Sequence, residues 1–221
     1  IPRVVTIHDL VWKYAGETMR RPTYFLEKIQ MPLAVRAADS IVADSQATAN
    51  AVKLEFGIDA DNLMVVSLAG NSVKNVASFD DLSAQGINGS YFLFVGTLEP
   101  RKNLTRLLTA YSLLPKAVKL QTSMVIAGGK GWGKVNLEDT IARLDLDGYV
   151  KVLGYVDEPK LAALYAHAKF LAMPSLYEGF GLPLVEAMMH GTPLLTANNS
   201  SIREVAGDAG LMVDASVINC I

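Results

Sequence analysis

Short runs of β-branched residues alternate with amphipathic segments along almost the whole chain, and this alternation restricts the fold more than any other feature. Strands that alternate with helices are typical of βαβ units, in which the strands form a parallel sheet. The sequence therefore predicts an α/β protein. In the first part of the chain, the expected strands are residues 3–9, 40–44 and 63–69, and the expected helices are residues 22–38 and a segment that Ser45 caps and Gly57 ends.

A second group of alternating segments begins at Tyr91, after a stretch that breaks the pattern. Residues 71–90 are rich in Ser, Asn, Asp and Gly and have no periodicity, which indicates a linker. We therefore expect two domains: a partial Rossmann-like domain at 1–70 and a nearly complete, doubly wound Rossmann-like domain at 91–221. The expected strands of the second domain lie near residues 91–95, 122–127, 149–153, 169–173, 193–197 and 211–213.

The first domain is expected to be incomplete. A doubly wound domain usually has about six strands, whereas three are expected before the linker. The chain also begins with Ile1 rather than with Met. We therefore expect a fragment or a processed product whose upstream part is missing.

The composition excludes several classes of protein. Hydrophobic residues make up 51% of the 221 positions, enough for a globular core, and 20 basic against 22 acidic residues do not indicate a nucleic-acid-binding surface. Cys220 is the single cysteine, and no Cys/His cluster has the spacing of a zinc site. No apolar run approaches the roughly 18 residues of a transmembrane helix, and the first ten residues do not have the pattern of a signal peptide. We expect a cytoplasmic protein without a structural metal.

The loop "EGFGLPLVE", residues 178–186, follows an expected strand and enters an expected helix. Ligands of open α/β sheets bind at the carboxyl ends of the strands, where such loops lie. Gly179 and Gly181 allow backbone conformations closed to other residues, so free amides at the turn can face a ligand. Glu186 is expected in the first helical turn and Glu178 before it, so both carboxylates can bind hydroxyl groups of one ligand. Taken alone, a helix-dipole role for Glu186 and a solvated Glu178 explain the pattern equally well.

The loop "GTLEPRKN", residues 96–103, lies between an expected strand and an expected helix. Arg101 and Lys102 add two cations to the positive end of that helix, which suits a diphosphate ligand. The alternative is an ordinary basic loop with Asn103 as the N-cap of the helix.

A third loop, "TIHDL" at residues 6–10, ends the first expected strand in His8 and Asp9. A single histidine at such a point is usually structural. A neutral imidazole can nevertheless donate or accept a hydrogen bond, and it titrates near neutral pH. His8 is therefore a candidate for ligand binding or proton transfer.

Together, these loops resemble those of the retaining family-four glycosyltransferases, which have the GT-B fold of two Rossmann-like domains that face each other across a cleft. The most specific element is the Glu-x7-Glu pattern in "EGFGLPLVEAMMHGTP", and "FVGTLEPRKN" and "VLGYVDEPKLAALYAHAKFLAMPS" precede it in the same order and spacing. The resemblance covers nearly the whole chain. It departs from the commonest pattern of the family at one position: an arginine usually follows the glycine that ends the first strand of this domain, whereas here Thr97 follows Gly96.

The resemblance implies a nucleotide-sugar site on the second domain. Arg101 and Lys102 would bind the diphosphate, Glu186 the ribose, and Glu178 and the next three amides the transferred sugar and the phosphates. His8 would approach the donor sugar from the first domain. The implied catalytic residues are His8, Arg101, Lys102 and Glu178, and the implied nucleotide-sugar-binding residues are Gly96, Thr97, Arg101, Lys102, Gly154, Tyr155, Glu178, Gly179, Phe180, Gly181, Leu182 and Glu186.

The activity that the resemblance implies is transfer of a hexose from a nucleoside diphosphate sugar to an acceptor hydroxyl, with retention of the anomeric configuration and without a metal or other cofactor. The form of "GTLEPRKN" is similar to that of bacterial mannosyltransferases, which favours GDP-mannose over a UDP-sugar as the donor. The acceptor would be a sugar or a lipid-linked saccharide in the synthesis of cell-surface polysaccharide or glycolipid, with peripheral contact to the inner face of the membrane as an option.

Two alternatives stay open, a sugar-nucleotide epimerase of the same architecture and a non-catalytic nucleotide-sugar-binding module. They differ from the transferase in the fate of a labelled donor. As a fragment, the chain is expected to bind a nucleoside diphosphate with little or no turnover, because the acceptor-side domain is incomplete.

Several other residues receive structural interpretations. The stretch "GGKGWGK", residues 128–134, is expected to be a mobile loop at the cleft rather than a dinucleotide fingerprint. His167 is expected to be a packing residue within a helix. His190 is expected at a helix C-terminus, where a basic group interacts favourably with the helix dipole. Residues 13–36 mix basic and apolar side chains and fit a helix that docks on anionic lipid, but we expect a helix packed on its sheet with a solvated basic face.

Overall fold

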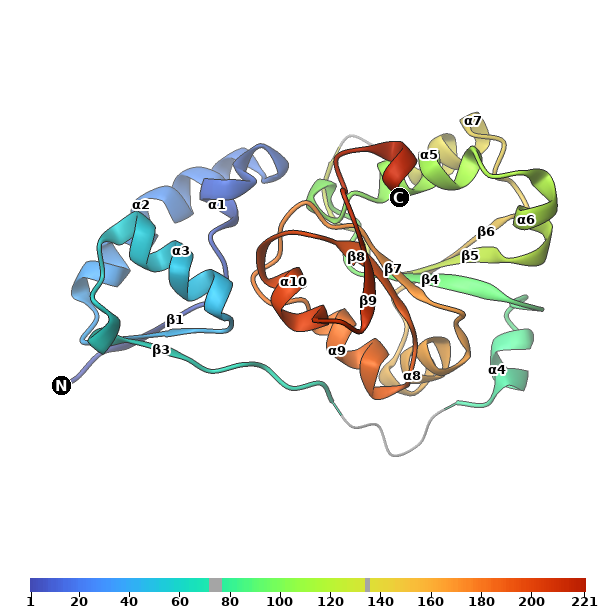
Figure 1. Ribbon diagram of the computed structural model, residues 1–221. Helices are drawn as coiled ribbons and strands as arrows, with labels where there is room; N and C mark the ends of the chain where they lie inside the picture. Colours follow the sequence, from blue (N-terminus) through green and yellow to red (C-terminus); the bar gives the residue numbers. More distant parts are fainter. Residues whose placement is uncertain (72–76, 134–135) are drawn as a thin grey trace.

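The chain forms two α/β units, each built on a parallel sheet (Figure 1). The computed structural model describes residues 1–71, 77–133 and 136–221. The first sheet has three strands and the second has six. The predicted α/β class is therefore confirmed, while residues 72–76 of the expected linker lie outside the described residues.

The first unit is a sheet with the strand order β1-β2-β3. Both strand pairs are parallel, and helices connect the strands. The buried core lies between this sheet and its helices, and consists of Ile7, Leu10, Val35, Ile41 and Val52. The elements are β1 (Val4–Ile7), α1 (Val11–Tyr14), a 3-10 turn (Gly16–Thr18), α2 (Arg21–Ala37), β2 (Ser40–Ala43), α3 (Gln46–Phe56), a 3-10 turn (Ala60–Asn62) and β3 (Leu63–Val65).

Helix α3 begins and ends where the sequence predicts. The Ser45 hydroxyl accepts a hydrogen bond from the amide of Thr48 and so caps the helix. Gly57 ends it with a φ of 64°, in the left-handed region that glycine tolerates. Strand β3, in contrast, has only three residues, because the chain leaves the sheet soon after it. The strand expected over residues 63–69 is therefore too long.

The second unit is a sheet with the strand order β6-β5-β4-β7-β8-β9, and its strands run parallel. This is the order of a doubly wound Rossmann-like domain, as predicted. The strand order reverses between β4 and β7, so the carboxyl ends of these strands flank the crevice where such folds bind ligands. The strands are β4 (Tyr91–Val95), β5 (Ser123–Ala127), β6 (Val150–Gly154), β7 (Leu171–Met173), β8 (Leu194–Ala197) and β9 (Gly210–Val213).

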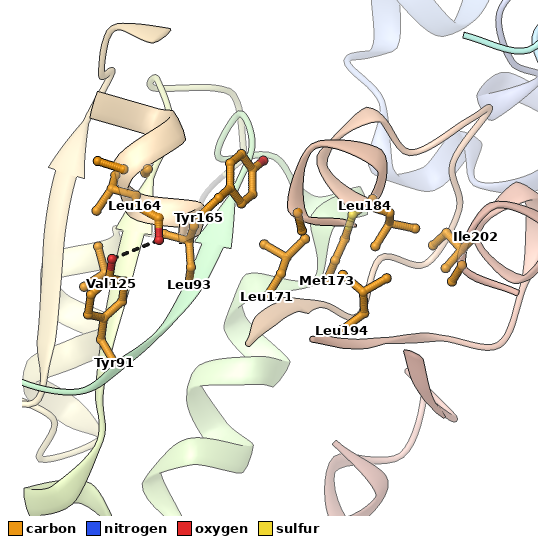
Figure 2. Close-up of a cluster of buried hydrophobic side chains, with 14 of the residues drawn as sticks. Tyr91, Leu93, Val125, Leu164, Tyr165, Leu171, Met173, Leu184, Leu194 and Ile202 are labelled. Carbon is orange, nitrogen blue, oxygen red and sulfur yellow. Dashed lines mark hydrogen bonds between the residues drawn. The ribbon is translucent and has the colours of Figure 1, made fainter. Parts of the chain in front are cut away.

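Helices cover both faces of the second sheet, because alternate residues of a strand point to opposite sides. Tyr91 and Leu93 of β4 lie in one core (Figure 2), where the Tyr91 hydroxyl donates a hydrogen bond to the Leu164 carbonyl at 2.8 Å. Phe92 and Phe94 lie in the core on the other face. The helical elements are α4 (Phe79–Ser83), a 3-10 turn (Pro100–Lys102), α5 (Leu104–Ser112), α6 (Lys116–Gln121), α7 (Leu137–Arg143), α8 (Glu158–His167), α9 (Leu182–Met189), α10 (Ser200–Ala206) and a 3-10 turn (Ile218–Cys220).

Part of the expected linker belongs structurally to the second unit. Residues 79–83 form α4, which packs against α8. Leu82 and Ile87 are fully buried in the core that contains Tyr91. The Ser78 hydroxyl and the Asp81 carboxylate bind each other's amides at the start of the helix, as in a capping box. Only two buried residues mark this segment, too few for a periodic pattern, which is why the sequence indicates a linker there.

We predict that Leu82→Ala lowers the free energy of unfolding of the second unit by about 2 to 5 kcal/mol, because it leaves a cavity in a closed core. Urea denaturation followed by circular dichroism measures this change. The control is Leu120→Ala, since Leu120 is 68% exposed and should change the stability little. Equal effects of the two substitutions would contradict the assignment of residues 77–90 to the second unit.

Candidate active site

The loops that follow β4 and β7 meet at the carboxyl edge of the second sheet. We call them the β4 loop, residues 96–103, and the β7 loop, residues 174–181. The amide of Leu176 donates a hydrogen bond to the carbonyl of Arg101 at 2.9 Å. The side chain of Asn103 donates to the first carbonyl of the β7 loop at 3.0 Å. The two loops therefore form one rigid surface at the point where the strand order reverses.

Four charged side chains form a buried cluster between these loops, which we call the charged cluster. Lys102 Nζ donates to Glu178 Oε1 at 2.7 Å. Arg101 pairs through one terminal nitrogen with Glu178 Oε2 and through the other with Glu99 Oε1. Glu178 is only 6% exposed, and Lys102 only 9%. Since two cations face two carboxylates, the cluster is neutral, as the burial of ions requires.

The charges of this cluster keep Glu178 ionised. Burial alone would raise the pKa of its carboxyl group, but the positive charges of Lys102 and Arg101 outweigh burial and hold the pKa below its ordinary value. The two carboxylates in turn hold the pKa of Arg101 above its ordinary value, against the effect of its own burial. The alternative of a solvated Glu178 is therefore wrong. The sequence brings Arg101, Lys102 and Glu178 to one site, but does not show that they bind one another.

The backbone of the β7 loop is held through its carbonyl groups. The Ser201 hydroxyl donates to the carbonyls of Glu178 at 2.9 Å and of Phe180 at 3.0 Å. The carbonyl of Gly179 accepts from side chains of the first unit. Within residues 1–71, 77–133 and 136–221, the amides of Gly179, Phe180 and Gly181 donate no hydrogen bond. Gly179, Phe180 and Gly181 are themselves buried.

The carboxylate of Glu186 is bound outside the charged cluster. Helix α9 begins directly after Gly181, whose φ of 102° ends the turn, so Glu186 follows the first helical turn instead of lying in it. Its carboxylate accepts a hydrogen bond from the Tyr165 hydroxyl at 2.8 Å. Burial raises its pKa, although the bond from Tyr165 acts in the opposite direction. The expected position of Glu186 in the first turn is therefore wrong, since Glu186 is the fifth residue of α9.

His8 lies at the carboxyl edge of the first sheet, where Asp44 orients it. Strands β1 and β2 pair Ile7 with Ala43. The residues that follow these strands, His8 and Asp44, therefore lie side by side. The His8 Nδ1 atom lies 2.7 Å from an oxygen of the buried Asp44 carboxylate, while the imidazole itself is largely exposed. This contact leaves Nε2 free for a ligand. Sequence reasoning missed Asp44, although it ends the strand "SIVAD" at the same sheet edge.

The two units touch at Gly179. A Cβ atom at this position would lie 1.9 Å from the carbonyl oxygen of His8, so no side chain fits there. The hydroxyls of Ser45 and Thr48 donate to the Gly179 carbonyl at 2.7 and 3.0 Å. The structure therefore brings the expected loops at residues 6–10 and 178–186 into direct contact.

A second contact between the units involves the start of α3. The two carboxylate oxygens of Glu204, in α10, accept hydrogen bonds from the amides of Gln46 and Ala47, each at 2.9 Å. These amides lack partners within their own helix because they belong to its first turn. A carboxylate at a helix N-terminus is also favoured by the helix dipole. Glu204 thus acts as a cap that one unit provides to a helix of the other.

The remaining predicted ligand residues lie along the same edge of the second sheet. Gly96 directly follows β4, and a Cβ atom on Gly128, after β5, would lie 1.9 Å from the Gly96 carbonyl oxygen. The amide of Gly128 donates to the Gly154 carbonyl at 2.8 Å, at the end of β6. Tyr155 follows and is 82% exposed, while Leu182 is the first residue of α9. Thr97 lines the cavity described next.

A cavity of about 390 Å³ lies between the two units. Charged side chains line it from both sides: Asp9, Arg20 and Glu27 from the first unit and Glu99, Arg101 and Lys130 from the second. Trp132 closes one part of it, because its indole N–H donates to the Thr18 carbonyl at 2.9 Å. The Arg20 guanidinium lies 5.3 Å from the centre of the indole ring. Lys130, Gly131 and Trp132 of the "GGKGWGK" stretch thus line the cleft, and Lys134 lies outside the described residues.

We predict that Glu178→Gln lowers the free energy of unfolding by about 3 kcal/mol, because it leaves two buried cations with one carboxylate. The control is Glu138→Gln, since Glu138 is exposed and should cost little. Thermal and urea denaturation at neutral pH measure both. If Glu178→Gln is no more destabilising than the control, the charged cluster does not stabilise the fold.

The pH dependence gives a second test of the same carboxylate. A carboxyl group whose pKa is lower in the folded state stabilises the protein above its unfolded pKa, and this stabilisation is lost as the pH falls through the folded value. Wild-type stability should therefore decrease below the ordinary value of 4.5. The decrease should be smaller in Glu178→Gln. Identical pH profiles would contradict the lowered pKa.

Comparison with known proteins agrees with this geometry. Residues 83–218 match the family described as "Glycosyl transferases group 1". The chain is 43% identical over 131 residues to "O-antigen chain mannosyltransferase B" of Escherichia coli, which covers 59% of this chain and 34% of the relative. It is 32% identical over 223 residues to the "Serotype-specific mannosyltransferase WbdA" of Escherichia coli, over 92% of this chain and 26% of that protein. The chain thus spans about a third or less of the length of these relatives.

Solved structures of glycosyltransferases share the arrangement of both units. HepE of Anabaena, solved in complex with UDP-glucose, superposes with a TM-score of 0.78 at 25% identity, over 99% of this chain and 62% of HepE. Sucrose-phosphate synthase of Thermosynechococcus elongatus superposes with a TM-score of 0.77 at 23% identity, over 98% of this chain and 56% of that protein. The predicted GT-B architecture is therefore confirmed. From its sequence match and its fold, the chain belongs to the group 1 family of glycosyl transferases.

Proposed function

We propose that the protein transfers a mannosyl residue from GDP-mannose to a hydroxyl group of a saccharide acceptor, with retention of configuration. Relatives with the names of O-antigen or serotype-specific mannosyltransferases support the sugar and the kind of acceptor. A UDP-sugar is the second candidate donor, since HepE was solved with UDP-glucose. As an O-antigen chain is a cell-surface polysaccharide, the acceptor would be a growing or lipid-linked saccharide on the cytoplasmic side.

The charged cluster is the observation that carries this proposal. Arg101 uses three of its five N–H groups on Tyr177, Glu178 and Glu99, and Lys102 uses one of three on Glu178. Both side chains therefore have donors left for a diphosphate while they remain paired with Glu178. The free amides of residues 179–181 lie in the same loop. Together they would stabilise the negative charge that develops on the departing diphosphate.

Glu178 would have two roles in this mechanism. Each of its oxygens accepts a bond from one cation, which fixes where the cations lie. An ionised carboxylate has about four acceptor positions, so it can also bind a hydroxyl group of the transferred sugar. Glu178 would thus align the leaving group and the sugar at once.

His8 would act from the opposite side of the cleft. Asp44 orients its ring, and the contact of its carbonyl with Gly179 places it beside the β7 loop. Its free Nε2 would hydrogen-bond the donor sugar or take part in proton transfer. Since protein groups meet the charge of the diphosphate, we propose that the reaction requires no metal.

We predict that Lys102→Met weakens GDP binding to this chain about tenfold or more but leaves guanosine binding unchanged, because a charge-assisted contact to phosphate is lost. Isothermal titration calorimetry measures both affinities, and circular dichroism confirms the fold. The control is Lys169→Met, since Lys169 is exposed at the opposite, amino end of β7. Equal losses for GDP and guanosine would remove Lys102 from the diphosphate site.

The activity itself is tested with labelled GDP-mannose and UDP-glucose, saccharide acceptors and EDTA, on the protein that contains this chain. We expect mannose transfer in the presence of EDTA and an α-linked product, which nuclear magnetic resonance identifies. An epimerised sugar would show an epimerase instead, and binding without chemistry would show a non-catalytic module. Transfer from UDP-glucose alone would overturn the proposed donor.

A further inference from the structure

A hydrogen bond between Tyr165 and Glu186 joins two helices beside the candidate active site. Tyr165 lies in α8 and Glu186 in α9, and these helices pack on each other. The Tyr165 hydroxyl donates to Glu186 Oε2 at 2.8 Å. In the part of the chain that the structure describes, the Glu186 carboxylate accepts no other hydrogen bond and forms no ion pair. The position of this carboxylate therefore depends on Tyr165.

Tyr165 is held by its own surroundings, so Glu186 adopts the position that the tyrosine allows. Tyr165 is only 1% exposed and lies in the same core as Leu164 and Leu171 (Figure 2). The Thr192 hydroxyl donates to the Tyr165 carbonyl at 2.7 Å. Burial, and then the charge of Glu186, raise the pKa of Tyr165 well above its ordinary value. The hydroxyl therefore keeps its proton and acts as the donor of this bond.

A neutral donor leaves the negative charge of Glu186 uncompensated, unlike the cations that bind Glu178. Lys102 and Arg101 neutralise Glu178, whereas the hydroxyl of Tyr165 carries no charge. An ionised carboxylate has about four acceptor positions, so about three remain on Glu186. Glu186 is half-buried, and hydrogen bonds to an ionised acceptor are stronger than those between neutral groups. The remaining positions suit a ligand that donates from two neighbouring hydroxyl groups.

Glu186 lies about one helical turn beyond the β7 loop. It is the fifth residue of α9, and one turn rises about 5.4 Å. Since the Cα–Cβ bonds of a helix tilt toward its N-terminus, the side chain leans back toward the loop that contains Glu178. A ribose is joined to its 5′-diphosphate through a single methylene group. A diphosphate bound by Arg101 and Lys102 would therefore leave its ribose within reach of Glu186.

We propose that Tyr165 is a positioning residue for the nucleotide part of the donor. Its hydroxyl holds the Glu186 carboxylate in the orientation that accepts hydrogen bonds from the 2′ and 3′ hydroxyls of the ribose. A glutamate side chain that is otherwise free loses rotational freedom when a ligand binds, and fixing it in advance reduces this cost. This role rests on the proposed function only in that the donor is a nucleoside diphosphate sugar, since GDP and UDP contain the same ribose.

The test compares the binding of GDP and of its 2′,3′-dideoxy analogue to the 221-residue chain by isothermal titration calorimetry. We expect the wild type to prefer GDP by about tenfold or more, because the analogue lacks the hydrogen bonds to an ionised carboxylate. Tyr165→Phe should weaken GDP binding by about three- to tenfold and leave binding of the analogue unchanged. In a Glu186→Ala background, the same substitution should change neither affinity, because the two residues act through one contact.

The matched control is Tyr111→Phe, which also removes a buried hydroxyl from the second unit. Tyr111 is 3% exposed, and its hydroxyl donates to the Thr122 carbonyl at 2.8 Å, at the amino end of β5. This variant should bind both ligands as the wild type does. If Tyr165→Phe weakens GDP and the analogue equally, or does not weaken GDP, the hydroxyl has only a structural role and the proposal is overturned.

A failure of the proposed function gives a different result. A wild type that binds UDP but not GDP overturns the proposed donor, and UDP and its dideoxy analogue then test Tyr165 in the same way. A wild type that binds GDP and the dideoxy analogue equally overturns the ribose role of Glu186, and the role of Tyr165 with it. That result leaves the diphosphate site of Arg101 and Lys102 intact.

Discussion

Glu178 can be buried as an anion only because Lys102 and Arg101 are buried beside it. Without these cations, a carboxyl group buried at this position would take up a proton, or its side chain would stay exposed to water. The pairing joins the loop after β4 to the loop after β7, the two strands between which the order of the sheet reverses. It therefore fixes the shape of the crevice before any ligand enters. The free donors of Arg101 and Lys102, and the free amides beside Glu178, all depend on this one arrangement.

The position of the first unit depends on the same loop. Gly179 lies directly behind Glu178, and its missing side chain leaves room for the carbonyl of His8. The Gly179 carbonyl is bound by Ser45 and Thr48, at the start of α3. Loop and helix thus align the histidine of one unit with the charged cluster of the other. The cleft is organised by backbone contacts, which tolerate little displacement.

The sequence predicts much of this architecture, because helix caps and strand patterns are local. Ser45 and Gly57 bound α3 as expected, and the order of strands and loops places the charged residues at one sheet edge. Features that depend on contacts between distant parts of the chain are harder to predict from the sequence. The sequence shows that Arg101 and Lys102 are basic, but it does not show whether their side chains point to solvent or to Glu178. Asp44 becomes notable only when β2 lies beside β1, and the segment that contains α4 is marked by just Leu82 in the helix and Ile87 after it. Helix α2 has exposed apolar residues, such as Phe25 and Ile29, as well as the buried Val35, so the sequence cannot show which side of the helix meets the sheet.

The cap that Glu204 provides to α3 has a consequence for motion. When the units separate, the amides of Gln46 and Ala47 lose their acceptor and turn to water, and the first turn of α3 loses a stabilising charge. Opening of the cleft is therefore coupled to fraying of a helix end. The same turn contains Thr48, which binds the loop of Glu178. Amide hydrogen exchange at the start of α3 thus reports the fraction of time that the cleft is open.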